Sequence, residues 1–133
     1  GLHAAPDRLD VDVPETLPRV HVDPTLLERA VANLVDNALS FAPPGDRVRV
    51  EAGAVRDEVH LRVVDTGPGI PAAERDRVFR PFQRLGDRPN GAGVGLGLAV
   101  AKGFVNAVGG ELDIEDTPGG GCTMVVTLPV VAE

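Results

Sequence analysis

The chain has 133 residues, of which 43% are hydrophobic, and its formal net charge is −7. This length and composition fit one domain with one core, and the acidic charge argues against a nucleic-acid-binding protein. The single cysteine, Cys122, excludes an internal disulfide and is expected to be a small core residue in a reducing compartment. No apolar stretch approaches the roughly 18 residues of a membrane span, so we expect no insertion into a membrane. Because the chain begins with glycine, we expect residues 1–133 to be one domain excised from a longer protein.

An extended segment and a long helix are predicted first. Residues 8–22 alternate between apolar and polar side chains, and two prolines confine them to edge strands or an entry hairpin. Asp23 is a suitable N-cap, with Pro24 at the first helical position. We therefore expect a helix to about Phe41, where a Pro-Pro-Gly sequence stops it.

This helix is amphipathic. At about 100° per residue, the side chains of Asn33, Asn37 and Ser40 fall at the rim of the apolar stripe, where they can meet a ligand lying over the core. The apolar stripe consists of Leu27, Val31, Leu34, Ala38 and Phe41.

Two half-buried strands are predicted next, over residues 47–55 and 58–67, with a turn around Arg56 and Asp57. The second strand ends its apolar row with Asp65, a carboxylate that is costly to bury unless it is hydrogen-bonded.

The rest of the chain completes a layered fold. A short helical piece over residues 72–79 precedes an arginine-bearing loop, a glycine run and a helix to about Val108, which is nearly all apolar and is expected to be largely buried. Two strands close the chain, over residues 110–116 and 121–129. This order favours the α+β class, a two-layer sandwich with helices on one face of a mixed, mostly antiparallel sheet, over a doubly wound fold.

One basic segment interrupts the acidic chain. Its five arginines lie within fourteen residues that contain only two acids, so we expect this segment to face an anion. They are Arg75, Arg77, Arg80, Arg84 and Arg88.

Three short stretches have the residue types of a nucleotide site, and each also has a purely structural interpretation. The amides of Asn33 and Asn37 can be ligands of Mg²⁺ or solvated polar positions. In "DTGPGI", Asp65 can accept a hydrogen bond from the amine of adenine, or the glycines can form an ordinary turn. A loose dinucleotide pattern also fits there, but Pro71 interrupts the helix start and no βαβ unit follows.

The third stretch, "GVGLGLA", comes directly before the second helix. Its glycines at 93, 95 and 97 can direct backbone N–H groups and a helix N-terminus at an anion, or they can form a flexible loop followed by a close-packed helix.

Taken in order, these stretches resemble the ATP-binding catalytic domain of sensor histidine kinases. The asparagine pair, D-x-G-x-G-I, "VFRPFQR" and G-x-G-L-G-L correspond to that family's N, G1, F and G2 boxes, over residues 9–129. "GVGLGLA" and the closing "TPGGGCTMVVTLP" look like the potassium-responsive KdpD type. The resemblance implies the ATP-binding (Bergerat) sandwich shared with gyrase B, the chaperone Hsp90 and MutL.

The resemblance also implies roles for individual residues. Asn37 would bind the Mg²⁺ that bridges the ATP phosphates, with Asn33 supporting catalysis one turn earlier. Asp65 would accept from the adenine amine, and Arg84 would reach the γ-phosphate as a catalytic residue. Further contacts to the nucleotide or anchors of its lid would come from Gly67, Gly69, Ile70, Phe79, Phe82, Gly93, Val94, Gly95, Leu96, Gly97 and Leu98.

The implied activity is a protein-histidine kinase that acts in a two-component phosphorelay. The domain would transfer the γ-phosphoryl group of ATP to a histidine on a separate dimerisation and phosphoacceptor domain of the same kinase, and a response regulator would receive it next. We expect this domain not to phosphorylate itself, and to be the cytoplasmic, soluble C-terminal part of a membrane-anchored sensor kinase.

Three departures from the family pattern leave alternatives open. Ser40 stands where the family usually has lysine, Val94 replaces threonine or serine, and Cys122 begins the final strand in place of threonine or serine. The alternative is a degenerate nucleotide-binding module that docks a partner without efficient phosphotransfer. An ATPase of the gyrase or Hsp90 kind would need a glutamate base where this chain has Asn33, whereas a serine kinase of the anti-sigma type would share the fold.

Overall fold

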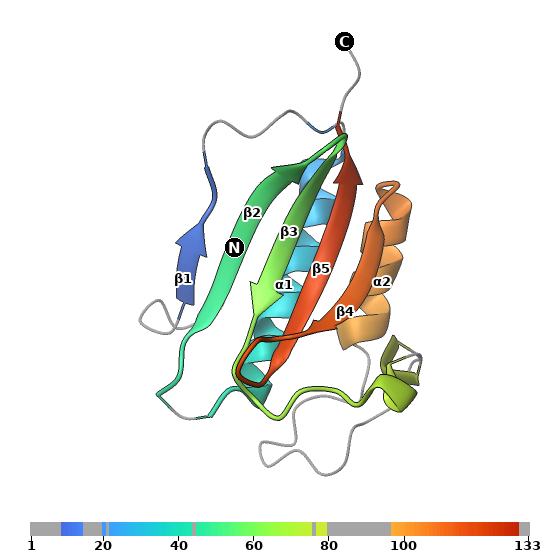
Figure 1. Cartoon of the computed structure of the whole chain (residues 1–133). Helices are drawn as coiled ribbons and strands as arrows, with labels where there is room; N and C mark the ends of the chain where they lie inside the picture. Colours follow the sequence, from blue (N-terminus) through green and yellow to red (C-terminus); the bar gives the residue numbers. More distant parts are fainter. Residues whose placement is uncertain are drawn as a thin grey trace.

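Five strands and two α-helices form the part of the chain that the structure describes (Figure 1). The computed structural model describes residues 9–14, 20, 22–43, 45–75, 77–79 and 97–130. The elements are β1 (Leu9–Asp12), α1 (Pro24–Phe41), β2 (Val48–Val55), β3 (Glu58–Val64), the short 3₁₀ helices η2 (Ala72–Glu74) and η3 (Arg77–Phe79), α2 (Gly97–Ala107), β4 (Glu111–Asp116) and β5 (Cys122–Pro129).

The strands make one sheet in the order β1-β2-β3-β5-β4. β1 pairs with β2 in parallel, and all other pairs are antiparallel, so the predicted mixed, mostly antiparallel sheet is confirmed. β1 is an edge strand, as one alternative predicted. The described Val20 bridges to Val130 and not to β1, so the described residues of this segment do not form the alternative, an entry hairpin. Both α-helices lie on the same face of the sheet, which confirms the two-layer sandwich (Figure 1).

The local signals at the start of α1 act as expected. The Asp23 carboxylate accepts from the backbone N–H groups of Thr25 and Leu26, at 2.9 and 3.3 Å. The helix ends at Phe41, as predicted. Its buried face is rotated from the predicted stripe, because α1 packs against both the sheet and α2. The fully buried residues are Ala30, Leu34, Val35 and Ala38.

α2 is less buried than the sequence predicts. Leu98, Ala101 and Val105 face the core, but Val100 is 41% exposed and Asn106 is also exposed. The expectation of a largely buried helix is therefore wrong: one face of α2 packs on α1 and the sheet, while the opposite face has no cover from the described part of the chain. No helix among the described residues is long and apolar enough to cross a membrane.

The core lies between the helices and the sheet, and the candidate site lies at one end of the sheet. Residues such as Leu34, Val63 and Val126 are completely buried in it. At the lower end in Figure 1, the end of α1, the end of β3, the start of α2 and the β4–β5 turn come together. The last turns of α1, the turn after Asp65 and the described start of α2 therefore lie at the same end of the sandwich.

Candidate functional site

Asp65 directly follows β3 and is only 3% exposed. Its Oδ1 accepts hydrogen bonds from the backbone N–H groups of Gly67 at 2.9 Å and Cys122 at 3.2 Å. Its own N–H donates to the carbonyl of Cys122 at 2.9 Å. The predicted need of this buried carboxylate for hydrogen-bond partners is thus met by backbone atoms.

Burial and hydrogen bonding act in opposite directions on this carboxyl group. Burial is the larger effect and raises the pKa of Asp65, while the N–H groups of Gly67 and Cys122 lower it. Within the described part of the chain no hydrogen bond uses Oδ2. One oxygen therefore holds the side chain in place, and the other remains available as an acceptor for a ligand.

The β4–β5 turn forms the second wall of this site. Thr117 Oγ1 donates to the carbonyl of Asp65 at 3.1 Å and lies 2.9 Å from Thr123 Oγ1, whose residue is 5% exposed. The sequence interpretation missed both threonines. The signal was the alternation in the last strand, which pairs Thr123 with Val64 and so puts it beside Asp65.

The glycines after Asp65 are required by the protein's own backbone. A Cβ at Gly67 would lie 2.6 Å from the carbonyl oxygen of Phe41, so the turn passes directly against the end of α1. Gly69 has a φ of +79°, which an L side chain rarely adopts. At Gly67 the close approach is to the end of α1, so this glycine joins β3 to α1, and its approach to a ligand stays a prediction.

On α1, the predicted rim position of Asn33, Asn37 and Ser40 is confirmed, since all three are half-buried. Ser40 Oγ donates to the backbone carbonyl of Asn37 at 2.7 Å, so this hydroxyl is bound to its own helix. Asn33 lies in a cavity of about 630 Å³ between α1 and Phe104 of α2.

The segment beyond the turn is partly described. Phe79 of η3 packs against the core, and Lys102 Nζ of α2 lies 4.7 Å from the centre of its ring. The side chains of Ile70 and Leu98 belong to the core itself, and Gly97 begins α2. The remaining site residues lie outside the described residues: Phe82, Arg84, Gly93, Val94, Gly95 and Leu96.

Of the five arginines in the segment expected to face an anion, the structure describes two, Arg75 and Arg77. Arg75 donates to Asp116 Oδ1 at 2.5 Å, and Arg77 donates to Glu74 Oε1 at 2.8 Å. These two side chains are engaged within the protein, so the expectation of an anion-facing role is wrong for them. Arg80, Arg84 and Arg88 fall outside the described residues.

Cys122 is a buried core residue, as predicted. Burial, and next the nearby Asp65 carboxylate, raise the pKa of its thiol to about 12. The thiol is therefore neutral, and the backbone of Cys122 is the part that contacts Asp65.

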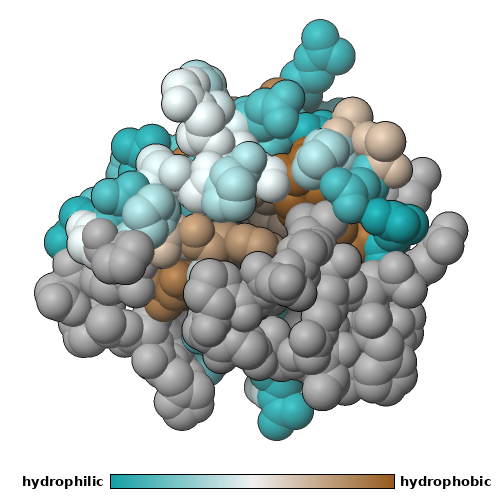
Figure 2. All heavy atoms as spheres, turned by 90° about the horizontal axis from the view of Figure 1, so that it is seen from below, coloured by the Kyte–Doolittle hydropathy of each residue, from teal (hydrophilic) through white to brown (hydrophobic). Residues whose placement is uncertain are grey.

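The surface at this end of the sandwich combines apolar and polar character. Figure 2, the view from below, shows hydrophobic residues near the middle of this face with hydrophilic residues along one side. A fixed carboxylate with an acceptor oxygen suits a ligand that presents an N–H donor, and apolar surface suits a flat ring.

Comparison with known proteins agrees with this arrangement. A family model described as "Histidine kinase-, DNA gyrase B-, and HSP90-like ATPase" matches residues 22–132. The chain belongs to this family of ATP-binding domains. Among its relatives, sensor protein KdpD from Rathayibacter rathayi is 53% identical over 131 residues, and KdpD from Mycobacterium tuberculosis is 52% identical over 122 residues. These matches cover 98% and 92% of this chain but only 15% and 14% of those proteins.

Solved structures of histidine kinases have the same fold. The mycobacterial sensor histidine kinase MprB matches with a TM-score of 0.78 at 35% identity, over 95% of this chain and 85% of that one. The ATP-binding domain of PrrB from Mycobacterium tuberculosis matches with a TM-score of 0.73 at 30% identity, over 96% of this chain and 84% of that one. The predicted fold and the predicted family are therefore confirmed.

Proposed function

We propose that this domain binds Mg²⁺ and ATP and supplies the γ-phosphoryl group to a histidine on a separate phosphoacceptor domain of the same kinase. The observation that carries the proposal is Asp65, whose Oδ1 is fixed by two backbone N–H groups while Oδ2 is left as an acceptor. An ionised carboxylate accepts hydrogen bonds and does not donate them, so it selects the exocyclic amine of adenine over the carbonyl of guanine.

The residues of α1 suit a magnesium ion carried by the nucleotide. Among the described residues no cluster of three His, Cys, Asp or Glu side chains could hold a metal by itself. Asn37 is a half-buried residue of α1 with a neutral amide oxygen. Mg²⁺ commonly takes one or two protein oxygens of this kind while phosphates and water supply the rest. Bound there, Mg²⁺ would neutralise phosphate charge.

In phosphoryl transfer, the protein contributes mainly by aligning the reacting groups and neutralising the charge of the phosphates. The bond from the γ-phosphorus to its bridging oxygen breaks, ADP leaves with that electron pair, and a bond to an imidazole nitrogen forms. We assign Arg84 to the γ-phosphate, and the backbone N–H groups around Gly93 and Gly95 to the phosphates. Asn33 has an amide, which cannot deprotonate water, so phosphoryl transfer is favoured over the hydrolysis of a gyrase-type ATPase.

The names of the relatives support our proposal for the partners and the location of this domain. Both KdpD proteins are named sensor proteins, and a structural neighbour, full-length ShkA, was solved in complex with AMPPNP. We place this domain in a cytoplasmic, membrane-anchored sensor kinase whose phosphohistidine passes the phosphoryl group to a response regulator. The isolated domain is expected to bind nucleotide without phosphorylating itself.

A binding experiment tests the adenine site. A fluorescent ADP analogue should bind the wild type, and Asp65→Asn should weaken binding about tenfold or more, because the new amide sets a donor against the adenine amine. Equal affinity of the two proteins would remove Asp65 from the site. For catalysis, the domain is mixed with its phosphoacceptor domain and radiolabelled Mg·ATP, and labelled histidine is measured; no label despite tight binding would contradict the kinase assignment.

A degenerate binding module is the second candidate, and Ser40 is the observation that favours it. Its hydroxyl is bound to the carbonyl of Asn37, and it carries no cation for the phosphates. If Ser40→Lys raises histidine labelling from zero to a measurable rate, the natural chain is such a module. Labelling by the natural chain at a comparable rate excludes it.

A further inference from the structure

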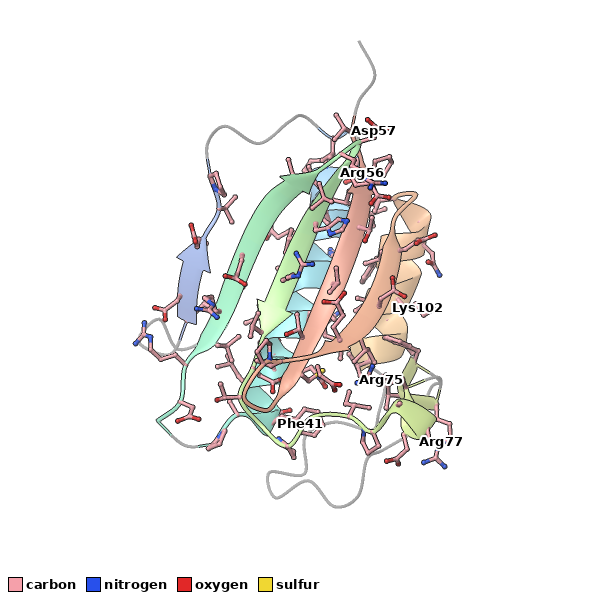
Figure 3. The ribbon with its side chains drawn as sticks, viewed as in Figure 1. Phe41, Arg56, Asp57, Arg75, Arg77 and Lys102 are labelled. Carbon is pink, nitrogen blue, oxygen red and sulfur yellow. The ribbon has the colours of Figure 1, made fainter. Side chains whose placement is uncertain are left out.

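The side chain of Arg75 contacts the turn that follows β3. The tight backbone bonds of η2 run from Glu74 N–H to the carbonyl of Pro71 at 2.9 Å and from Arg75 N–H to the carbonyl of Ala72 at 3.3 Å. They fold the chain back so that the Arg75 side chain lies between this loop and the lower end of β4 (Figure 3).

The guanidinium of Arg75 joins three acceptors. Nε donates to the carbonyl of Ile70 at 3.2 Å, Nη1 to the carbonyl of Ile114 at 3.4 Å, and Nη2 to Asp116 Oδ1 at 2.5 Å. Ile70 ends the glycine turn after Asp65, whereas the other two acceptors belong to β4. One side chain therefore ties the turn to a strand about 40 residues further along the chain.

The carbonyl bonds matter more than the ion pair. The Asp116 side chain is 83% exposed, and solvent-exposed ion pairs contribute little to stability because water screens them. The Arg75 side chain is only 26% exposed, and its bond to Ile70 is partly buried, where a charged donor on a carbonyl is stronger. The main effect of Arg75 is thus to fix the backbone at Ile70.

We infer that Arg75 is a positioning residue for adenine recognition, which rests on the function proposed above. One end of the turn is fixed where Gly67 N–H donates to Asp65 Oδ1, and the other end is fixed where the Ile70 carbonyl accepts from Arg75. With both ends held, the Asp65 carboxylate keeps one direction toward the base. Arg75 acts through the Ile70 carbonyl and does not itself touch the nucleotide.

The neighbouring arginine provides a matched control. Arg77 lies two residues further along, is 50% exposed, and donates to Glu74 Oε1 within its own segment. In Figure 3 it lies on the outer side of this segment, beyond Arg75. Arg75→Ala and Arg77→Ala remove the same charge from the same region, so a general electrostatic effect on an anionic ligand is matched between them.

The test compares two nucleotides that differ at the adenine amine. Dissociation constants for ADP and for inosine diphosphate, which has a carbonyl in place of the amine, are measured for the wild type and for Arg75→Ala, Arg77→Ala, Arg75→Lys and Asp65→Asn. Thermal unfolding confirms that each variant is folded at the assay temperature. The ratio of the two dissociation constants reports whether the Asp65 carboxylate is directed at the adenine amine. A general loosening of the fold would weaken the binding of both nucleotides equally.

We expect Arg75→Ala to reduce the preference for ADP about tenfold, and Arg77→Ala to change it less than about twofold. Arg75→Lys should recover only part of the preference for ADP, because a compact ammonium group cannot reach three separate acceptors. If Arg75→Ala does not fold, Arg75→Lys takes its place in the test. An unchanged ratio in folded Arg75→Ala or Arg75→Lys, with the ratio lost in Asp65→Asn, would overturn the inference alone. A wild type that does not distinguish the two nucleotides would overturn the proposed function.

Discussion

The Asp65 carboxylate is buried at 3% exposure, and within the described residues its hydrogen bonds come from two backbone N–H groups. Because its pKa is raised, the folded chain holds this proton more tightly than the unfolded chain does. The resulting contribution to the free energy of unfolding is complete below the ordinary pKa of 3.8 and is lost as the pH rises through the raised value.

Replacing this residue should therefore change how stability depends on pH. Asp65→Asn keeps a side-chain oxygen for the two N–H groups and has no charge to bury, so its stability relative to the wild type should increase over the pH range above the ordinary pKa of 3.8. Urea unfolding of both proteins across this range measures the difference, and other titrating groups cancel in the subtraction. A difference that does not vary with pH would contradict the burial effect. The variant is thus expected to gain stability at neutral pH while it loses nucleotide affinity.

At the scale of elements, the contact between the β3 turn and the end of α1 sets the geometry of the site. Gly67→Ala forces a Cβ against the carbonyl oxygen of Phe41 and should lower the free energy of unfolding by about 1 to 3 kcal/mol. Gly53→Ala is the control, since a Cβ there meets nothing within 4 Å and β2 favours a residue with a side chain; its effect should stay within about 0.5 kcal/mol. Chemical denaturation of both variants measures this, and equal effects would show that the close approach to α1 is not the cause.

The sequence predicts elements whose signals are local. Asp23 and Pro24 mark the start of α1, which agrees with the structure. Alternation marks the strands, but β3 ends at Val64 and not at residue 67, because Asp65 and the glycines after it form the turn. The burial of α2 is not a local property, because its apolar residues do not reveal which face another element covers. That is why Val100 is exposed although its neighbours in sequence are equally apolar.

In the candidate site, too, the residues with a local signal could be predicted from the sequence and those that depend on strand pairing could not. Asp65 stands out in the sequence because a carboxylate ends an apolar row. Thr117 and Thr123 do not stand out, because their role depends on how β5 pairs with β3. The basic composition around Arg75 indicates an anion, yet its side chain is used by backbone carbonyls that only the fold brings near.

For the whole molecule, the proposed nucleotide should act as a stabilising ligand. The site is assembled from α1, the turn after β3 and the β4–β5 turn, so it exists only in the folded chain, and a ligand bound there shifts the folding equilibrium. At a concentration of about 100 times its dissociation constant, Mg·ADP should add about 2.7 kcal/mol to the free energy of unfolding. Thermal unfolding with and without Mg²⁺ measures this effect.

The control for that experiment is Asn37→Ala. It should reduce the stabilisation by ADP in the presence of Mg²⁺ more than in its absence, because the amide is assigned to the metal. An equal loss under both conditions would show damage to the fold rather than loss of a magnesium ligand.

The pairing at the end of β3 has a consequence for how freely the site can vary. Asp65 N–H bonds the carbonyl of Cys122, but the return bond from Cys122 N–H goes to the Asp65 side chain, so a carboxylate substitutes for a main-chain acceptor in the last rung of the ladder. Residue 122 contributes only atoms that every amino acid except proline possesses. The anchor of the carboxylate therefore depends on the backbone of residue 122 and not on its thiol, while the side chain at this buried position has to fit the core.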